Sequence, residues 1–149
     1  ILNGFLRLAQ NQTCPIVWPL HPRTKKAIEE TVDPQIVNDL MRNENIRITQ
    51  PIGFLDMIAL EQNTRLILTD SGGLQKEAFF FKKPCIILRD QTEWVELVEN
   101  GNALLVGSNE GKLIEAFHQL SHKNDFTYPP FFGDGHAAEE ICRLMIEHI

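Results

Sequence analysis

The chain has 149 residues, of which 43% are hydrophobic and 23% charged, and its formal net charge is −6 at pH 7. These values are typical of one folded domain with a sizeable core, and they exclude a disordered chain. The excess of acidic residues, with a pI near 5.3, argues against a nucleic-acid-binding surface. The basic residues are therefore expected to act through local contacts rather than through a positive surface potential.

The cysteines and the termini indicate the cellular setting. Cys14, Cys85 and Cys142 are far apart and lack metal-binding spacing, so we expect reduced core residues of a cytoplasmic protein without a metal site. No apolar run reaches the ~20 residues of a membrane span and no signal peptide is visible, which predicts no membrane partner. Because Ile1 is not Met and already lies in a helical pattern, we expect the chain to be a piece of a longer protein.

Hydrophobic spacing predicts short strands that alternate with helices. The expected strands are residues 14–20, 45–50, 65–69, 85–88 and 103–107. The expected helices are residues 1–9, 25–32, 34–42, 54–62, 72–81, 95–99 and 109–120, and a last helix that Asp134 caps.

Two of these helices have a predicted apolar face. The apolar face of the helix over residues 54–62 contains Phe54, Leu55, Ile58 and Ala59. That of the last helix contains Ala138, Ile141, Leu144 and Met145. Both faces are expected to pack inward, as amphipathic helices of globular proteins do.

The alternation of strands and helices predicts an α/β fold with a parallel sheet. Ligands of such sheets bind beyond the carboxyl ends of the strands. Four polar loops lie there, at residues 21–26, 50–53, 70–73 and 89–94. Their expected convergence favours a binding site at this edge.

The most informative loop joins the strand that ends at Asp70 to the next helix. Ser71, Gly72 and Gly73 form a turn before that helix, and its first N–H groups are open to an anion such as a diphosphate. Glu77, two turns into the helix, could accept hydrogen bonds from the hydroxyls of a ribose. The alternatives are an ordinary turn with Ser71 as N-cap and a surface carboxylate at Glu77.

Basic residues open the helix that follows the first predicted strand. His21 and Arg23 either meet an anionic ligand or point into solvent, because positive charge opposes the dipole at a helix N-terminus. The motifs of P-loop NTPases and dinucleotide-binding folds are absent. Ser71 also lacks the glycine-flanked elbow of a serine hydrolase.

The central motif closely resembles that of the non-hydrolysing UDP-N-acetylglucosamine 2-epimerases. The similar segments are residues 68–78, Lys83-Pro84, residues 88–90, Thr92-Glu93 and Gly107, with His21-Pro22-Arg23 and residues 132–135 in corresponding places. The resemblance runs over nearly the whole chain. It implies the second of two Rossmann-like domains of a GT-B-type fold, a doubly wound parallel sheet with the active site in the cleft between the domains.

The resemblance also implies roles for individual residues. Ser71, Gly72 and Gly73 would hold the UDP diphosphate and Glu77 the ribose. Ile52, through its backbone, and Met57 would flank the uracil. Further sugar or phosphate contacts are expected from His21, Arg23, Arg89, Thr92, Glu93 and Trp94.

Two positions depart from the family's common pattern. Met57 stands where an aromatic residue is common, so thioether packing or the nearby Phe54 would replace base stacking. Trp94 replaces an arginine, and an indole is uncharged and donates one hydrogen bond. The sequence Thr92-Glu93-Trp94-Val95-Glu96 is similar to the branch that acts on UDP-2,3-diacetamido-2,3-dideoxy-glucuronic acid.

The reaction that the resemblance implies is inversion at C2 of a UDP-N-acetylhexosamine by elimination and re-addition of UDP, with no cofactor. The family's catalytic carboxylates lie in the first domain, so we expect no catalytic residue in residues 1–149 and no epimerisation by this chain alone. The full-length protein is expected to be a homodimer. The alternatives are the donor-binding domain of a GT-B glycosyltransferase and a non-catalytic nucleotide-sugar-binding module.

Overall fold

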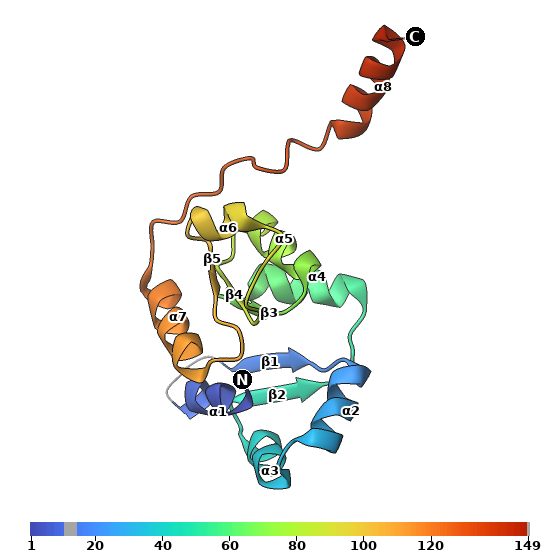
Figure 1. Ribbon diagram of the computed structural model, residues 1–149. Coiled ribbons are helices and arrows are strands. Elements are labelled where there is room, and N and C mark those ends of the chain that lie inside the picture. Colours follow the sequence, from blue (N-terminus) through green and yellow to red (C-terminus); the bar gives the residue numbers. More distant parts are fainter. Residues whose placement is uncertain (11–14, 149) are drawn as a thin grey trace.

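The computed structural model describes residues 1–10 and 15–148, and Cys14 lies outside these residues (Figure 1). The strands are β1 (Ile16–Pro19), β2 (Ile46–Thr49), β3 (Ile67–Thr69), β4 (Cys85–Ile87) and β5 (Ala103–Leu105). The helices are α1 (Leu2–Gln10), α2 (Pro22–Thr31), α3 (Pro34–Arg42), α4 (Phe54–Asn63), α5 (Gly72–Phe80), α6 (Val95–Glu99), α7 (Glu110–His122) and α8 (Ala137–Glu147). The predicted alternation of strands and helices is confirmed.

Backbone pairing divides the described strands between two parallel sheets. β1 pairs with β2, and β4 lies between β3 and β5, with Cys85 opposite both Ile67 and Ala103. The α/β class with parallel strands is confirmed, while the single sheet that the sequence predicts consists of two hydrogen-bonded parts. Strands of three or four residues form short ladders, so side-chain packing has to connect these parts.

The buried strand β4 has helices on both faces. Ile86 is fully buried in a cluster that contains residues of α1, α3 and α7, and that also reaches Ile46 of β2. Cys85 and Ile87 point the other way, into a cluster with Ala78 of α5 and residues of α6. Side chains of a strand alternate between its faces, so an apolar strand requires cover on both. The arrangement is therefore doubly wound, and the first cluster joins the two sheets.

The predicted apolar face of α4 does not pack inward. Phe54 is 71% exposed and Leu55 is 78% exposed, whereas the buried residue of this helix is Glu61, which is 3% exposed. The prediction was wrong because a pattern of apolar spacing does not say which side of a helix meets the neighbouring element. This inversion leaves a carboxyl in the protein interior.

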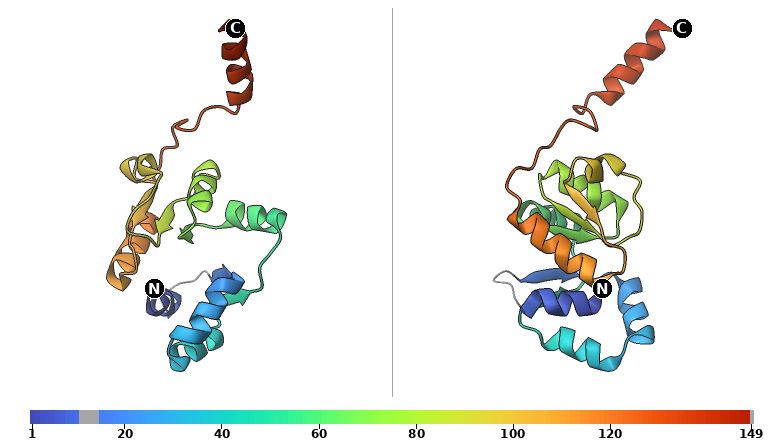
Figure 2. Two further views of the ribbon diagram at one scale, coloured as in Figure 1. Left: turned by 45° about the vertical axis from the view of Figure 1, so that its right-hand side comes forward. Right: turned by 60° about the vertical axis from the view of Figure 1, so that its left-hand side comes forward.

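Helix α8 lies at the end of an extended segment, away from the rest of the chain (Figure 2). Ile141 is 57% exposed and Met145 is 61% exposed, so the predicted inward face is open. Asp134 is not the N-cap: the helix begins after His136, whose N–H donates to Asp134 Oδ1 over 3.1 Å. Asp134 therefore closes a turn that precedes the helix. No helix of the described residues is long and apolar enough to cross a membrane.

Candidate functional site

The open end of α5 is the centre of the candidate site. Ser71 occupies the N-cap position, but its side chain makes no capping hydrogen bond. Its own N–H donates to Thr69 Oγ1 over 3.0 Å, and its carbonyl accepts the N–H of Gln75. The N–H groups of Gly72 and Gly73 belong to the first turn, which has no partners within a helix. An anion here would meet these two groups and the Ser71 hydroxyl, rather than the Ser71 N–H.

The two glycines are needed for space rather than for backbone freedom. Neither has a positive φ, and a Cβ at Gly72 would lie 3.5 Å from Glu93 Oε2 and 3.6 Å from Trp94 Nε1, which is ordinary contact. A side chain would therefore fit the fold. It would also occupy volume next to the N–H groups, where a ligand oxygen has to approach.

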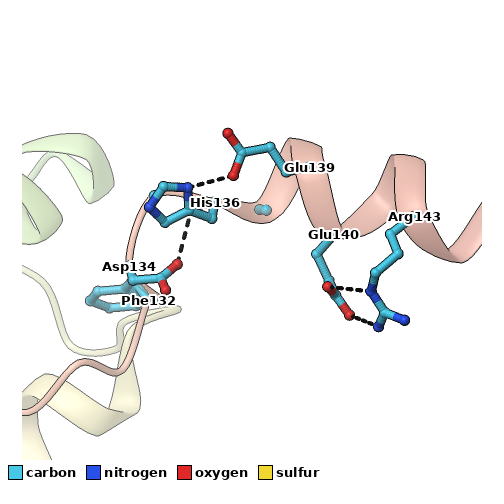
Figure 3. Close-up of a pocket in the computed structure, with 9 residues that line it drawn as sticks. Phe132, Asp134, His136, Glu139, Glu140 and Arg143 are labelled. Atoms are coloured by element: carbon cyan, nitrogen blue, oxygen red, sulfur yellow. Dashed lines mark hydrogen bonds and ion pairs between the residues drawn. The ribbon is translucent and has the colours of Figure 1, made fainter.

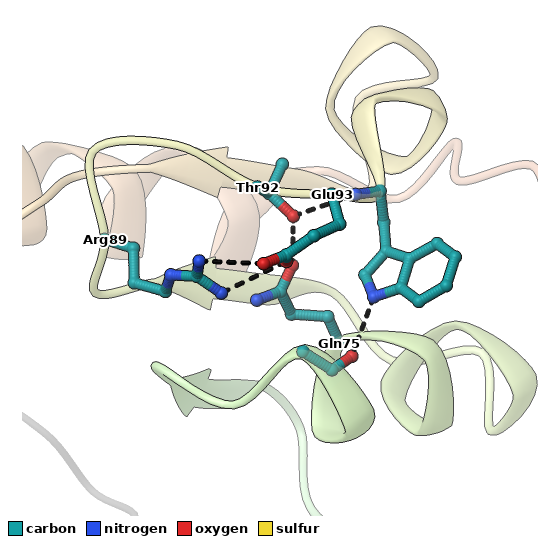
Figure 4. A network of polar contacts seen from close by, with 6 residues as sticks. Gln75, Arg89, Thr92 and Glu93 are labelled. Atoms are coloured by element: carbon teal, nitrogen blue, oxygen red, sulfur yellow. Dashed lines mark hydrogen bonds and ion pairs between the residues drawn. The ribbon is translucent and has the colours of Figure 1, made fainter.

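The polar loop after β4 is hydrogen-bonded to α5. Trp94 Nε1 donates to the carbonyl of Gly72 over 2.9 Å, and Thr92 Oγ1 donates to Gln75 Oε1 over 2.5 Å. Gln75 is fully buried, and its Nε2 has no hydrogen-bond partner among residues 1–10 and 15–148. These contacts bring residues 71–75 and 92–94 into one network (Figure 4). Sequence reasoning missed Gln75, although a polar residue among apolar neighbours of a packed helix is a usable signal.

Arg89 and Glu93 form a bidentate pair within this loop. Two guanidinium nitrogens donate to the Glu93 carboxylate over 3.1 and 2.9 Å (Figure 4). The hydrogen bond from Arg89 lowers the pKa of Glu93. The loop is fixed further at Gly107, which has φ +58 and donates its N–H to the Arg89 carbonyl over 3.1 Å. A Cβ at Gly107 would overlap the Asp90 carboxylate, so this position requires glycine.

Lys76 lies over two aromatic rings beside the turn. Its Nζ is 4.5 Å from the ring centroid of Trp94 and 4.5 Å from that of Phe132. The two rings meet edge to face at 5.6 Å. The ammonium group therefore contributes positive charge next to the glycines, at a position that the sequence analysis did not single out.

The carboxyl of Glu77 has a buried carboxyl as its neighbour. Glu77 is half-buried in α5, one helical turn after Gly73. Burial, and after it the charge of Glu77, raise the pKa of Glu61 from 4.5 to about 6. The sequence predicted Glu77 as a site residue but gave no role to Glu61.

The other predicted residues have local contacts. His21 caps α2, since its Nδ1 accepts the N–H of Arg23 over 3.2 Å, and both residues are exposed. Among the described residues, no hydrogen bond or ion pair connects His21 or Arg23 with residues 70–75. Ile52 and Met57 are half-buried before and within α4, on the helix that carries Glu61. Their ligand roles stay predictions.

A hollow beside α8 is a less suitable site. It is lined by Phe132, Asp134, His136, Glu139, Glu140 and Arg143, among others (Figure 3). Arg143 is already paired with Glu140 and with Glu147, and His136 with Glu139. In the described part of the chain no group of three or more His, Cys, Asp or Glu side chains could hold a metal ion.

Comparison with known proteins finds similarity to one family over nearly the whole chain. Residues 1–146 match the family of UDP-N-acetylglucosamine 2-epimerases. A UDP-N-acetylglucosamine 2-epimerase of Methanocaldococcus jannaschii is 42% identical over 146 residues, which are 97% of this chain and 38% of that protein. The UDP-2,3-diacetamido-2,3-dideoxy-D-glucuronate 2-epimerase of Pseudomonas aeruginosa is 41% identical over 136 residues, 91% of this chain and 36% of that protein.

A solved structure is similar over the same region. The M. jannaschii UDP-GlcNAc 2-epimerase in complex with UDP-GlcNAc and UDP superimposes with a TM-score of 0.84 and 40% identity, covering 98% of this chain and 39% of that one. The chain thus spans well under half the length of the relatives it matches. Because the family match covers residues 1–146, the chain belongs to the UDP-N-acetylglucosamine 2-epimerase family.

Proposed function

We propose that residues 1–149 form the UDP-binding domain of a nucleotide-sugar 2-epimerase. The observation that carries the proposal is the open N-terminus of α5, where the Ser71 hydroxyl makes no capping bond. Neutral N–H groups and the helix dipole at this end favour a diphosphate. A helix end that served only as a turn would use its N-cap side chain on its own backbone.

The spacing along α5 fits a nucleoside diphosphate. Gly73 and Glu77 are four residues apart, so they share one face of the helix at a separation of about one turn, roughly 5–6 Å. With the phosphates on the glycines, the ribose hydroxyls would meet the Glu77 carboxylate, and Ile52 and Met57 would flank the base. The sugar would then lie toward Arg89, Thr92, Glu93 and Trp94.

The proposed substrate is a UDP-N-acetylhexosamine. Relatives named for UDP-N-acetylglucosamine and for its diacetamido-uronate analogue match at almost equal identity, 42% and 41%. Trp94, which stands where the family commonly has arginine, favours the diacetamido substrate. Mass spectrometry of the products that a full-length protein forms from each UDP-sugar tests this choice, and turnover of UDP-N-acetylglucosamine alone would contradict it.

In the whole protein the domain would hold UDP while the bond between UDP and the sugar breaks and forms again. Elimination and re-addition of UDP inverts C2 without net consumption of the nucleotide, provided that UDP stays bound between the two steps. Proton transfer at the sugar would fall to residues of the other domain. A chain that binds UDP but never turns over in the presence of that domain would instead be a non-catalytic binding module.

Titration calorimetry with UDP tests the nucleotide site directly. Glu77→Ala should weaken binding by about 10- to 100-fold, since a charge-assisted hydrogen bond contributes on the order of 1.5–3 kcal/mol. Glu115→Ala, which removes an exposed carboxylate of α7, is the matched control and should bind as the wild type does. Equal affinities of the Glu77→Ala and wild-type chains would refute the ribose role.

A further inference from the structure

A carboxylate lies beside the turn that is proposed to bind the diphosphate. Glu93 Oε2 is 3.5 Å from the position that a Cβ of Gly72 would occupy. That position borders the volume through which a ligand oxygen has to approach the N–H groups of Gly72 and Gly73. The hydrogen bond from Arg89 lowers the pKa of Glu93, so the carboxylate is ionised at neutral pH. A bound diphosphate and this carboxylate would therefore share the end of one helix.

An uncompensated carboxylate at this place should oppose the binding of a diphosphate. Like charges a few ångströms apart repel each other, and more strongly at a protein surface than in bulk water. Asp70 adds a second carboxyl group, since it precedes the N-cap residue Ser71 in the chain. The helix dipole supplies only about half a positive elementary charge at this end. The site thus requires a cation that offsets the nearby carboxylate.

Arg89 meets this requirement. Its terminal guanidinium nitrogens donate to the two oxygens of the Glu93 carboxylate over 3.1 and 2.9 Å (Figure 4). A guanidinium in this forked arrangement faces the carboxylate, so its charge cancels that of Glu93 first. Lys76, a further cation of α5, lies over the rings of Trp94 and Phe132.

We infer that Arg89 enables the turn at Gly72 and Gly73 to accept a diphosphate by cancelling the charge of Glu93, and that it does so without touching the phosphates. The inference rests on the proposed binding of a diphosphate at this turn. Arg89 is thus a positioning residue, because it acts on the ligand through another side chain.

The pair also explains the presence of an acid beside a phosphate site. The Glu93 side chain is 57% exposed, and the two hydrogen bonds from Arg89 use one lone pair of each oxygen. The remaining lone pairs can accept hydrogen bonds from hydroxyl groups of the sugar. An ionised acceptor next to the diphosphate is tolerable only when a cation balances it.

Charge compensation predicts opposite effects for the two members of the pair. Arg89→Gln leaves the Glu93 carboxylate uncompensated and should weaken the binding of a diphosphate about tenfold. Glu93→Gln should bind at least as tightly as the wild type. The double variant Arg89→Gln/Glu93→Gln should return to within about twofold of the wild-type affinity. Arg89→Lys, which keeps the charge and loses the planar fork, should do the same.

NMR titration of the backbone amides of Gly72 and Gly73 with inorganic pyrophosphate and with UDP, at pH 7.5, measures these affinities at the turn itself. An exposed ion pair contributes little to folding, so the variants should keep the wild-type spectrum away from this loop. Arg143→Gln, which breaks an exposed Arg–Glu pair of α8, is the matched control and should bind as the wild type does. In about 0.5 M KCl the defect of Arg89→Gln should become smaller, because salt screens the repulsion.

The inference is overturned if the double variant or Arg89→Lys binds as weakly as Arg89→Gln, because the guanidinium would then contact the phosphates itself. It is also overturned if Arg89→Gln binds as tightly as the wild type, or if its defect does not change with salt. Pyrophosphate contains no nucleoside, so it tests the pair independently of the proposed function. If the pattern of variants is found with pyrophosphate while UDP binds no more tightly than pyrophosphate, the nucleotide site fails and the inference stands. If neither ligand shifts the two amide signals of the wild type, both are refuted.

Discussion

The indole Nε1 of Trp94 donates a hydrogen bond to the backbone carbonyl of Gly72 over 2.9 Å. Gly72 is the first residue of α5, and Trp94 ends the polar loop that follows β4. The bond therefore fixes the distance between the turn that would hold a diphosphate and the loop that would face the sugar. An arginine at this position would reach a ligand with its charge, whereas the indole acts on the protein backbone.

Loss of this hydrogen bond should reduce the affinity for UDP more than it reduces the stability of the fold. Trp94→Phe keeps an aromatic ring against Phe132 but removes the donor, which is worth about 1 kcal/mol. We expect a small decrease in denaturation midpoint and an approximately fivefold decrease in UDP affinity by calorimetry. Trp18→Phe, an equal change at the ring that meets Phe5, is the control. Unchanged UDP binding in Trp94→Phe would show that the indole does not position the turn.

Gly72→Ala should separate binding from stability. The added Cβ makes only ordinary contacts with Glu93 and Trp94, and alanine favours a helix over glycine by up to about 1 kcal/mol. Chemical denaturation should therefore find the variant as stable as the wild type or slightly more stable. Its UDP affinity should fall at least tenfold, because the methyl group blocks approach to the N–H groups. A variant with undiminished affinity would mean that phosphate binds elsewhere.

The buried acid should make stability depend on pH. The pKa of Glu61 rises from 4.5 to about 6 on folding, so the folded chain binds more protons than the unfolded chain between these values. The free energy of unfolding therefore decreases as pH rises through this window, by up to about 2 kcal/mol in total. Glu61→Gln carries no ionisable group and should lose this contribution to the pH dependence.

Guanidinium denaturation at pH 4.5 and 7.5 measures the effect. The difference in stability between Glu61→Gln and the wild type should shift in favour of the variant at the higher pH. Glu115→Gln, at an exposed carboxylate of α7, should show no such shift. Parallel stability curves for the wild type and Glu61→Gln would contradict a buried acid at this position.

Two cysteines should differ sharply in reactivity. Cys85 is 2% exposed, and burial raises the pKa of its thiol to about 12, whereas Cys142 is exposed on α8. Since the thiolate is the reactive form, iodoacetamide at pH 8 should modify Cys142 and leave Cys85 intact until the domain unfolds. Peptide mass spectrometry measures the extent of modification at both cysteines. Rapid modification of Cys85 under native conditions would show that β4 opens to solvent.

The sequence predicted the parts of the molecule that local pattern controls. The run Cys85-Ile86-Ile87 is apolar throughout and is buried on both faces. The helix predicted over residues 109–120 is likewise present as α7, and its buried residues Leu113, Ala116 and Leu120 have the spacing of one helix face. The turn at residues 70–73 was predicted because two glycines follow an apolar run that ends at Asp70 and precede a helical pattern.

The parts that the sequence did not predict depend on contacts between distant residues. Nothing in the order of residues 54–63 says that Glu61 faces inward while Phe54 and Leu55 face solvent, because that depends on where α5 lies. The hydrogen bond from Thr92 to Gln75 spans 17 positions and joins the loop after β4 to helix α5, and the approach of these two segments follows from the sheet. Pattern reasoning locates a helix, but the rotation of the helix about its axis is a tertiary property.

The detached position of α8 has a consequence for hydrogen exchange. The helix has 11 residues, none of them buried. Isolated helices of this length are only marginally stable in water, because they form too few hydrogen bonds to offset the conformational entropy lost in the first turn. With its apolar side chains wetted, α8 should open and close continually and lose its amide protons quickly, while those of β4 exchange last, at the rate of global unfolding. Any surface that covered Ile141 and Met145 and excluded water from them would be detected first as slower amide hydrogen exchange in α8.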